Sequence, residues 1–482
     1  MKKIAIFIFV LFIPFFVFAQ ENSSDLENDL FGGDEDTLIS ADEARSDSKS
    51  NLKFKADLEK ASLSLESKKL RIGGSLSSSM EINYAWVDPY SKKDDYLKSF
   101  KDGKGTFNTT LNGSLFFDAR PNEDLKLYGK FLFGFPFEKS LSGALTVPKN
   151  SFGPLPPNDI ILPIGVNGAA NIKIQELYTD FSAKDIAFFR FGKHAVKWGT
   201  GYFYSPADVI NISRIDPQDP TADREGGISL RTHIIIPKTQ HNIWLYMLPP
   251  GQGEDFDPKY TAGAAKGEFV VGNWELGFGG WYKYEKAPRL ITTVSGSIAG
   301  KVAVFGEGVF AWGSDYTYYK ADMSSYTEKN KPFFQATLGG SYSNADTNTT
   351  IALQYFYNGF GYSNTDVSTS ILEKAEDPVS LSDASFRKKL QNVLAMGNRG
   401  QHYIALNISQ NKLGTDKLSL NLFQQFAISE LEGFSKLTLN WKIYKFASMS
   451  TGPSFSYPLS PSSKTKGQIG YSLSFRLGGG TF

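Results

Sequence analysis

The stretch from residue 172 to residue 233 carries charged side chains whose spacing places them on one face of neighbouring strands. Its polar members are Glu176, Tyr178 and Asp180 in one segment, Arg190 in the next, and Arg231 and His233 in a third. A short turn at residues 183–185 would bring Arg190 beside Tyr178, between the levels of Glu176 and Asp180. Such a group can serve as a structural ion-pair ladder, or as a charged lining that selects solutes.

A long connection from Gly199 to Glu225 follows and adds further candidate residues. It contains Asp208, Arg214, Asp216 and Arg224, and His194 lies shortly before it. Connections of this length are often functional, and this one could either fold into a lumen as a constriction or lie on top of the molecule. The spacing of Asp216, Asp219 and Asp223 would suit Ca²⁺, but the glycine and terminal glutamate of an EF-hand loop are missing. We therefore expect no metal and no cofactor.

Catalysis has little support in the sequence. The histidines are His194, His233, His241 and His402, and none lies in a His-Glu-x-x-His motif. A Gly-x-Ser-x-Gly elbow is also missing. The sequence has no cysteine, which excludes disulfides, thiolate metal sites and lipoprotein modification. We expect that this protein is not an enzyme.

The elements that must position these side chains are β-strands. In the last sixteen residues, apolar side chains occupy one face, and the other face is polar or small: Ile469, Tyr471, Leu473, Phe475 and Leu477 against Gln468, Gly470, Ser472, Ser474 and Arg476. This period of two begins at Leu70 and recurs to the end of the chain, with short turns and mostly longer loops in alternation. The pattern predicts an all-β fold, a transmembrane antiparallel β-barrel of about eighteen strands (range about 16–18) over residues 70–482.

Composition agrees with a barrel in a membrane. Aromatic residues make up 14% of the chain, there are 45 glycines, and the formal net charge is +1, so we expect no nucleic-acid partner. In lipid every backbone polar group must be satisfied within the protein, and a closed barrel achieves this. A lysine or arginine on the lipid face would cost about 2–4 kcal/mol at the midplane, so the charged residues named above should point inward.

The first 69 residues form two separate regions. Lys2 and Lys3 precede the apolar stretch Ile4–Phe18, and small residues follow, so residues 1–19 are expected to be a signal peptide cleaved after Ala19; an uncleaved anchor is the alternative. Residues 20–69 form an acidic leader or linker on the periplasmic side. This leader could also act as a plug or as a partner-binding segment.

Two stretches resemble known families. The C-terminal strand resembles the assembly signal of bacterial outer-membrane barrels through Gln468, Gly470, Leu473, Phe475 and the terminal Phe482, although Gly478–Gly480 departs from the usual spacing. This resemblance implies recognition by the barrel assembly machinery and a position in outer-membrane lipid. Residues 172–227 resemble alginate-export-type channels, in which a Glu-x-Tyr strand precedes a Gly-Arg/Lys…Trp-Gly segment and a Pro-x-Asp loop; Trp198 and Asp208 match these positions.

These observations favour a bacterial outer-membrane channel, a porin, for passive diffusion of small hydrophilic solutes through a charged lumen. Two alternatives share the fold. One is a surface-exposed adhesin or binding barrel with an occluded lumen. The other is a plugged transporter of hydrophobic substrates, which mostly polar inward faces would disfavour. The pattern does not specify the solute or the oligomeric state.

A helix is expected in the late loop, over residues 383–396.

Overall fold

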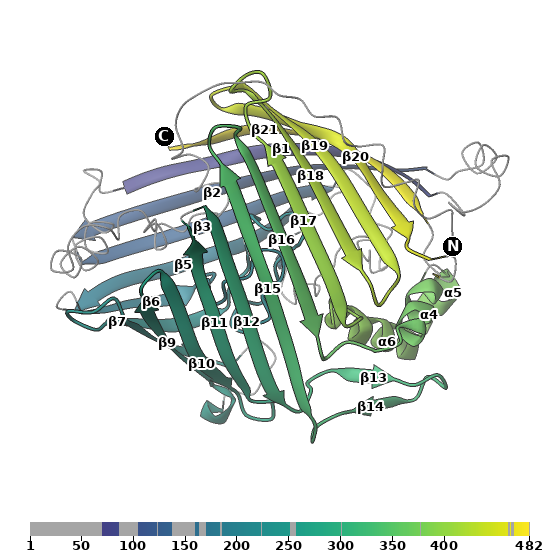
Figure 1. Cartoon of the computed structure of the whole chain (residues 1–482), viewed down its shortest axis with the longest axis horizontal. Coiled ribbons are helices and arrows are strands. Elements are labelled where there is room, and N and C mark those ends of the chain that lie inside the picture. The colour runs from purple at the N-terminus through teal and green to yellow at the C-terminus, as the bar shows by residue number, and fades with distance from the viewer. Residues whose placement is uncertain are drawn as a thin grey trace.

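The computed structural model describes residues 70–85, 105–122, 124–136, 160–162, 170–183, 186–222, 224–250, 257–299, 301–375, 377–460, 463 and 467–481. The expected signal peptide, the acidic leader and Phe482 lie outside these residues. The described strands form one large antiparallel sheet that curves round until its first and last strands pair (Figure 1). Nineteen strands belong to the sheet, and eighteen of them close the barrel, because β4 is a three-residue strand beside β5. The predicted fold is therefore confirmed.

The strands of the first half of the barrel are β1 (Leu70–Ala85), β2 (Gly105–Asn122), β3 (Leu125–Pro136), β4 (Ile160–Leu162), β5 (Ala170–Ala183), β6 (Ala187–Lys193), β7 (Ile228–Ile235), β8 (Asn242–Leu248), β9 (Ala262–Val271) and β10 (Trp274–Tyr282). Those of the second half are β11 (Arg289–Ile298), β12 (Val302–Trp312), β15 (Pro332–Asn344), β16 (Thr349–Asn358), β17 (His402–Gln410), β18 (Leu418–Ala427), β19 (Glu432–Tyr444), β20 (Ala447–Pro458) and β21 (Gln468–Thr481).

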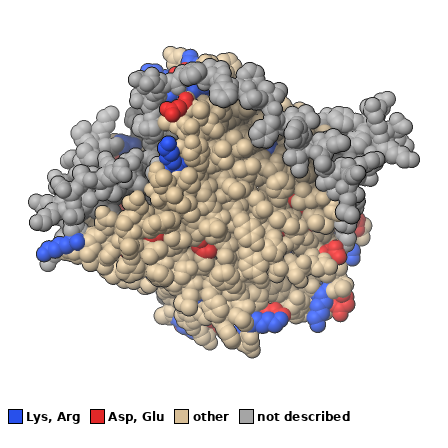
Figure 2. Space-filling view, in the orientation of Figure 1, with Lys and Arg blue, Asp and Glu red and all other residues tan. Residues whose placement is uncertain are grey.

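The outer surface of the barrel is apolar because the strands alternate in the way that the sequence predicts. Large apolar side chains stand exposed at every second position, for example Leu76 and Met80 on β1 and Leu353 and Tyr355 on β16. Figure 2 shows a broad surface on which most charged side chains lie near the edges. An apolar outer band of this kind is the surface that lipid chains contact.

The two ends of the barrel differ. The end that holds the start of β1 and the end of β21 has short turns, such as residues 272–273 between β9 and β10. The opposite end has most of the longer connections. One contains the hairpin β13 (Thr317–Tyr319) and β14 (Ser325–Thr327), and another contains α4 (Asp366–Lys374), α5 (Pro378–Ser382) and α6 (Ala384–Ala395). The helix expected over residues 383–396 is confirmed. A further short 3₁₀ turn, η3 (Pro258–Tyr260), precedes β9.

The hairpin and helices form what we call the outer cap (residues 313–331 and 359–401). Apolar side chains of both segments share two small buried clusters, which contain Tyr319, Ile371, Leu390 and Val393 in one and Tyr318, Tyr362 and Met396 in the other. The cap is therefore one packed unit at the end with the longer loops (Figure 1). None of the helices in the described part of the chain has the length and apolar character needed to cross a bilayer.

Candidate functional site: a loop that crosses the lumen

The inward loop (residues 194–227) leaves the wall after β6 and returns to it at β7. Its two legs are joined by backbone hydrogen bonds, including Ile212 N to Glu225 O at 2.8 Å. A Cβ on Gly226 would lie 1.6 Å from the carbonyl oxygen of His194, so the close approach of the legs requires glycine there. The loop begins before the predicted start at Gly199, because β6 ends at Lys193.

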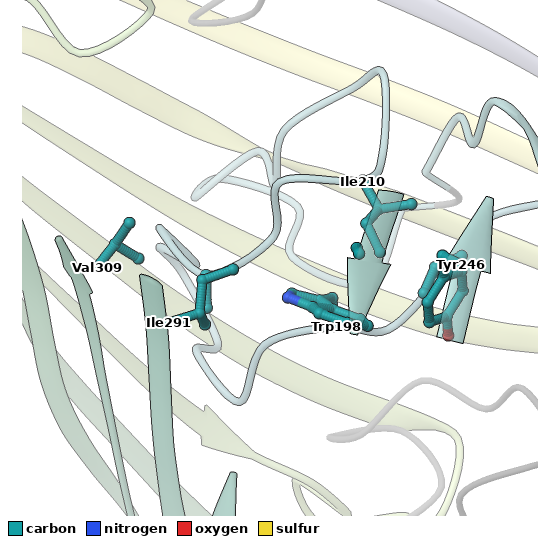
Figure 3. Packing of buried hydrophobic residues seen from close by; sticks show 8 residues of the cluster. Trp198, Ile210, Tyr246, Ile291 and Val309 are labelled. Atoms are coloured by element: carbon teal, nitrogen blue, oxygen red, sulfur yellow. The ribbon is translucent and has the colours of Figure 1, made fainter. Parts of the chain in front are cut away.

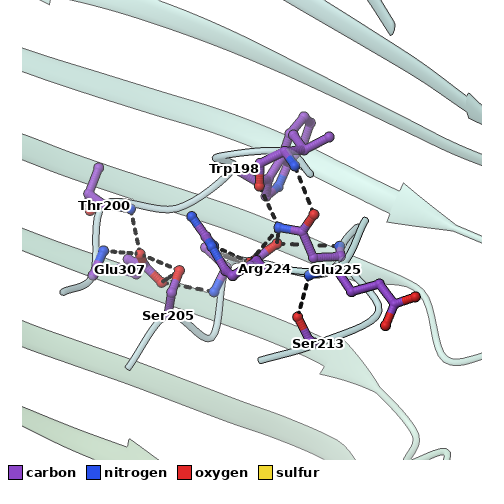
Figure 4. Close-up of polar contacts among 12 residues, drawn as sticks. Trp198, Thr200, Ser205, Ser213, Arg224, Glu225 and Glu307 are labelled. Carbon is purple, nitrogen blue, oxygen red and sulfur yellow. Dashed lines mark hydrogen bonds and ion pairs between the residues drawn. The ribbon is translucent and has the colours of Figure 1, made fainter. Parts of the chain in front are cut away.

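Glu307 on β12 and Gln354 on β16 point inward from the wall and hold the backbone of the inward loop. Figure 4 shows the contacts of Glu307. The Glu307 carboxylate accepts hydrogen bonds from the backbone N–H groups of Thr200, Gly201 and Ala207 at 2.5–2.8 Å, and from the Ser205 hydroxyl at 2.9 Å. The Gln354 side chain accepts from Phe203 N at 2.7 Å and donates to Tyr204 O at 2.6 Å. Because these residues point inward from the wall, the loop lies inside the barrel.

Two apolar clusters hold the loop against strands between β8 and β18. In the first, Trp198 and Ile210 of the loop pack on Tyr246, Ile291 and Val309 of β8, β11 and β12 (Figure 3). In the second, Phe203 and Tyr204 pack on β16, β17 and β18, chiefly on Phe356, Tyr403 and Phe423. The Trp198 side chain is 1% exposed. The expectation of mostly polar inward faces is therefore wrong for these strands, because the loop covers them and excludes water.

The predicted charged group assembles on β5 and β6. Asp180 lies directly opposite Arg190, and the two form a bidentate ion pair at 2.6 and 2.9 Å. The guanidinium also lies 4.1 Å from the centre of the Tyr178 ring. Glu176 accepts a hydrogen bond from Ala195 N at 3.2 Å, so it holds the base of the inward loop. The predicted proximity of Arg190 and Tyr178 is confirmed, but the predicted level is wrong, because Arg190 lies opposite Asp180 and Gly192 lies opposite Tyr178.

The next strand continues this face with Arg231 and His233. Arg231 is the cross-strand neighbour of Arg190, and His233 is that of Phe188. The His233 ring stacks on Trp244 with 3.7 Å between ring centres, and its Nε2 lies 3.1 Å from the Asn242 side-chain oxygen. Both β7 side chains are buried. Both side chains contact Trp244, which packs against the apolar cluster around Trp198.

Most charges of the inward loop and its base are compensated locally. Glu225 binds Lys173 at 2.6 Å and Lys193 at 2.7 Å. Burial favours the neutral form of this carboxyl, but the hydrogen bonds from the two lysines outweigh it and lower the pKa of Glu225 below its usual value. Asp208 pairs with Arg224 and accepts from the Asn211 amide. These carboxylates are therefore neutralised within the loop and its base.

Three predicted loop residues have other surroundings. His194 is fully buried, and its Nδ1 lies 3.1 Å from the Gly192 oxygen. Arg214 leaves the loop and donates to the backbone oxygen of Met396 and to the Tyr316 hydroxyl, so it joins the inward loop to the outer cap. Asp216 lies in an exposed turn with Asp219, and Asp223 lies outside the described residues. Within the described chain, no three acidic, histidine or cysteine residues gather as metal ligands.

Opposite the loop, the inner wall consists of small polar residues. We call this surface the serine wall, and its members lie on β1, β2, β20 and β21: Ser75, Ser77, Ser79, Thr110, Asn112, Ser114, Ser448, Ser450, Ser454, Ser456, Ser472 and Ser474. All of these side chains are at least partly exposed, whereas Gln354 beneath the loop is 0% exposed. The described residues thus fill one side of the lumen and leave the other accessible.

Residues of the C-terminal signal take their predicted faces in the closing strand. Leu473 and Phe475 point outward from β21, and Gln468 and Gly470 point inward. The strand pairs with β1, where Ser474 lies opposite Ser79. The strand thus completes the barrel.

Sequence reasoning missed the residues that hold the loop, namely Glu307, Gln354 and Lys266. Lys266 on β9 donates to Trp198 O at 2.9 Å and pairs with Glu268 at 2.8 Å. A signal was present for Glu307, because it is a single charged residue on an inward face that otherwise carries Phe305, Val309 and Ala311. An isolated charge among inward apolar residues indicates a partner that comes from elsewhere in the chain.

A substitution at Asp180 tests the ion-pair ladder. Asp180→Asn should lower the free energy of unfolding by about 3–5 kcal/mol, because it removes the carboxylate that compensates Arg190 beside Arg231. It should also shift the reversal potential toward anions. Urea titration of the folded barrel measures the first effect, with Asp124→Asn at an exposed turn as the control. The double variant Asp180→Asn/Arg190→Met should recover most of the loss, and an unchanged single variant would contradict the ladder.

A closed barrel of eighteen strands with an apolar outer band and a loop folded into its lumen is a porin-like β-barrel. No protein-family model matches the sequence, and no curated protein matches it. Among solved structures, the chain is similar to OccAB4 of Acinetobacter baumannii, with 8% identity, a TM-score of 0.47 and coverage of 86% of this chain and 99% of that chain.

Two further structures show similar values. OccK8 (OprE) of Pseudomonas aeruginosa has 9% identity and a TM-score of 0.46, with 85% of this chain and 98% of that chain covered. The outer membrane channel DcaP of Acinetobacter baumannii has 11% identity and a TM-score of 0.39, with 86% and 99% covered. These similarities concern the fold alone.

Proposed function

We propose that this protein is a bacterial outer-membrane porin through which small hydrophilic solutes diffuse passively. The observation that carries the proposal is the contrast across the lumen. The inward loop fills one side with packed side chains, and the serine wall on the other side keeps partly exposed hydroxyl groups. A wet polar surface inside an apolar outer band suits a water-filled path across a membrane.

Several finer features belong to the same proposal. Residues 1–19 direct export and are cleaved, residues 20–69 form a periplasmic leader, and the barrel assembly machinery recognises the C-terminal strand. The alginate-export-type resemblance is also part of it. The residues that carry it fall on β5, β6 and the inward loop, and the pairing of Asp180 with Arg190 supports a wall-building role for them. The constriction role of the inward loop and its charged residues is likewise proposed. We propose no enzymatic activity for this protein.

A binding barrel with an occluded lumen is the second candidate, and the outer cap favours it. Arg214 ties the cap to the inward loop, so the cap is held over the same end of the barrel. A plugged transporter of hydrophobic substrates has less support, because the loop already covers the apolar inner residues. The open porin and the binding barrel differ in whether ions pass through the lumen.

Single-channel recording separates these candidates. Full-length protein refolded into a planar bilayer should give stable, open conductance steps, because the serine wall side of the lumen is accessible. The fold of the same sample is checked by the heat-dependent shift in electrophoretic mobility that closed barrels show. A folded barrel that never conducts would overturn the channel and favour the binding barrel.

A further inference from the structure

We infer that the solutes of this channel are neutral, polyhydroxylated molecules of the sugar type, and that they move along the serine wall. This inference rests on the proposed channel function and names its solute class. The wall carries eleven hydroxyl groups and one amide on four adjacent strands. The roles of the charged residues described above do not account for this concentration of hydroxyl groups.

Four acidic residues on the charged side of the lumen are poorly suited to select cations, because each of them already has a basic partner. Asp180 is paired with Arg190, Glu225 with Lys173 and Lys193, and Asp208 with Arg224. On β3 and the end of β2, Asp118 binds Arg120 at 3.2 Å and Lys126 at 3.7 Å. A charged solute would have to compete with these ion pairs. These four carboxylates therefore stabilise the wall and the inward loop through their ion pairs, and the neutral wall contacts the solute.

The serine wall is almost uncharged. Two of its inward positions carry a charge, Glu81 and Arg476, and the two charges have opposite signs. The positions considered are the inward ones within residues 75–81, 110–114, 448–456 and 468–476. One row crosses all four strands through directly opposed residues, from Ser450 to Ser474, Ser79 and Thr110. The row forms a continuous hydroxyl strip around this side of the lumen.

These hydroxyl groups retain capacity to bind a solute. Ser79 and Thr110 share one hydrogen bond at 2.6 Å, Ser75 and Ser114 share one at 2.7 Å, and Ser450 donates to Asn440 at 2.6 Å. A hydroxyl group can donate once and accept twice, so one shared bond leaves further sites on each residue. The partly exposed side chains direct this capacity toward the lumen.

The chemistry of the strip matches that of a sugar. Solute hydroxyl groups also donate and accept, so a sugar can exchange its water for wall hydroxyls one at a time at little cost. Transport requires sites that bind well enough for entry and weakly enough for exit, and many equivalent neutral sites provide this. Small side chains also occupy little of the lumen on this side. An ion receives no comparable advantage from a neutral wall.

Three solutes of similar size test the inference: glucose, the anion gluconate and the cation glucosamine. Influx into vesicles that contain the full-length protein should be fastest for glucose. Faster influx of either charged solute would overturn the sugar assignment while the channel function stands. Lack of influx for all three, from a folded barrel, would overturn the channel function itself.

A triple variant tests the role of the wall. Ser79→Ala, Ser450→Ala and Ser474→Ala together remove three hydroxyls of one row without narrowing the lumen, and glucose influx should fall by about twofold or more while KCl conductance is retained. The matched control is Ser78→Ala, one position along β1 on the outward face, which should leave influx unchanged. Equal glucose influx in the triple variant and the wild type would contradict the proposed path.

Discussion

Replacing Glu307 with alanine should release the inward loop and give a channel with larger, noisier conductance steps. The carboxylate accepts hydrogen bonds from three backbone N–H groups and one hydroxyl of the loop. Each buried donor that loses its acceptor costs about 1–3 kcal/mol, so the free energy of unfolding should fall by about 3 kcal/mol or more. Single-channel recording and urea titration of the same preparation measure the two effects.

Two variants control for the loss of a carboxylate. Glu307→Gln keeps one acceptor oxygen and should show a smaller change of the same kind. Glu81→Gln removes a carboxylate from β1 on the opposite side of the lumen and should leave the conductance noise at the wild-type level. If Glu307→Ala conducted as quietly as the wild type, the inward loop would not depend on this anchor.

Replacing Trp198 with alanine should have the second large effect. Its indole is 1% exposed, and it meets Tyr246 edge to face with 5.0 Å between ring centres. Truncation of a buried tryptophan costs about 3–5 kcal/mol through lost contacts and the cavity that remains. We expect a loss of stability in this range in urea titration, accompanied by increased channel noise, because the cavity lies between the loop and the wall.

A matched tryptophan separates loop packing from tryptophan content. Trp441 on β19 is exposed on the outer face, so Trp441→Ala should leave the conductance unchanged. Because Glu307 and Trp198 hold the same loop, the double variant should lose less stability than the sum of the single losses. Full additivity would indicate that the two residues stabilise separate parts of the chain.

The barrel could be predicted because lipid and lumen impose a period of two on every strand. On β1 the outward Leu76 and Met80 alternate with the inward Ser77 and Ser79, and this pattern recurs until β21. Short turns and longer loops alternate because consecutive strands run antiparallel, so successive connections lie at opposite ends of the barrel. These features depend on neighbouring residues, which the sequence displays directly.

The path of the inward loop could not be predicted in the same way. The hydrogen bond from Thr200 to Glu307 joins residues 107 positions apart, and that from Phe203 to Gln354 joins residues 151 apart. Apolar inward residues such as Ile291 and Phe356 also interrupt the expected polar lining, because their partner is the loop rather than water. In contrast, the proximity of Arg190 to Tyr178 spans one short turn, and the sequence indicated it.

Cysteine accessibility tests the asymmetric lumen most directly, because the chain contains no cysteine of its own. Ser474→Cys places a thiol on the serine wall, and Val309→Cys places one beneath the inward loop, where the native side chain is 1% exposed. A charged, membrane-impermeant thiol reagent added to open channels should modify the cysteine at position 474 and reduce the current, and it should leave the cysteine at position 309 unmodified. Rapid modification at position 309, or an unreactive thiol at position 474, would contradict a lumen that is filled by the loop on one side and open along the serine wall.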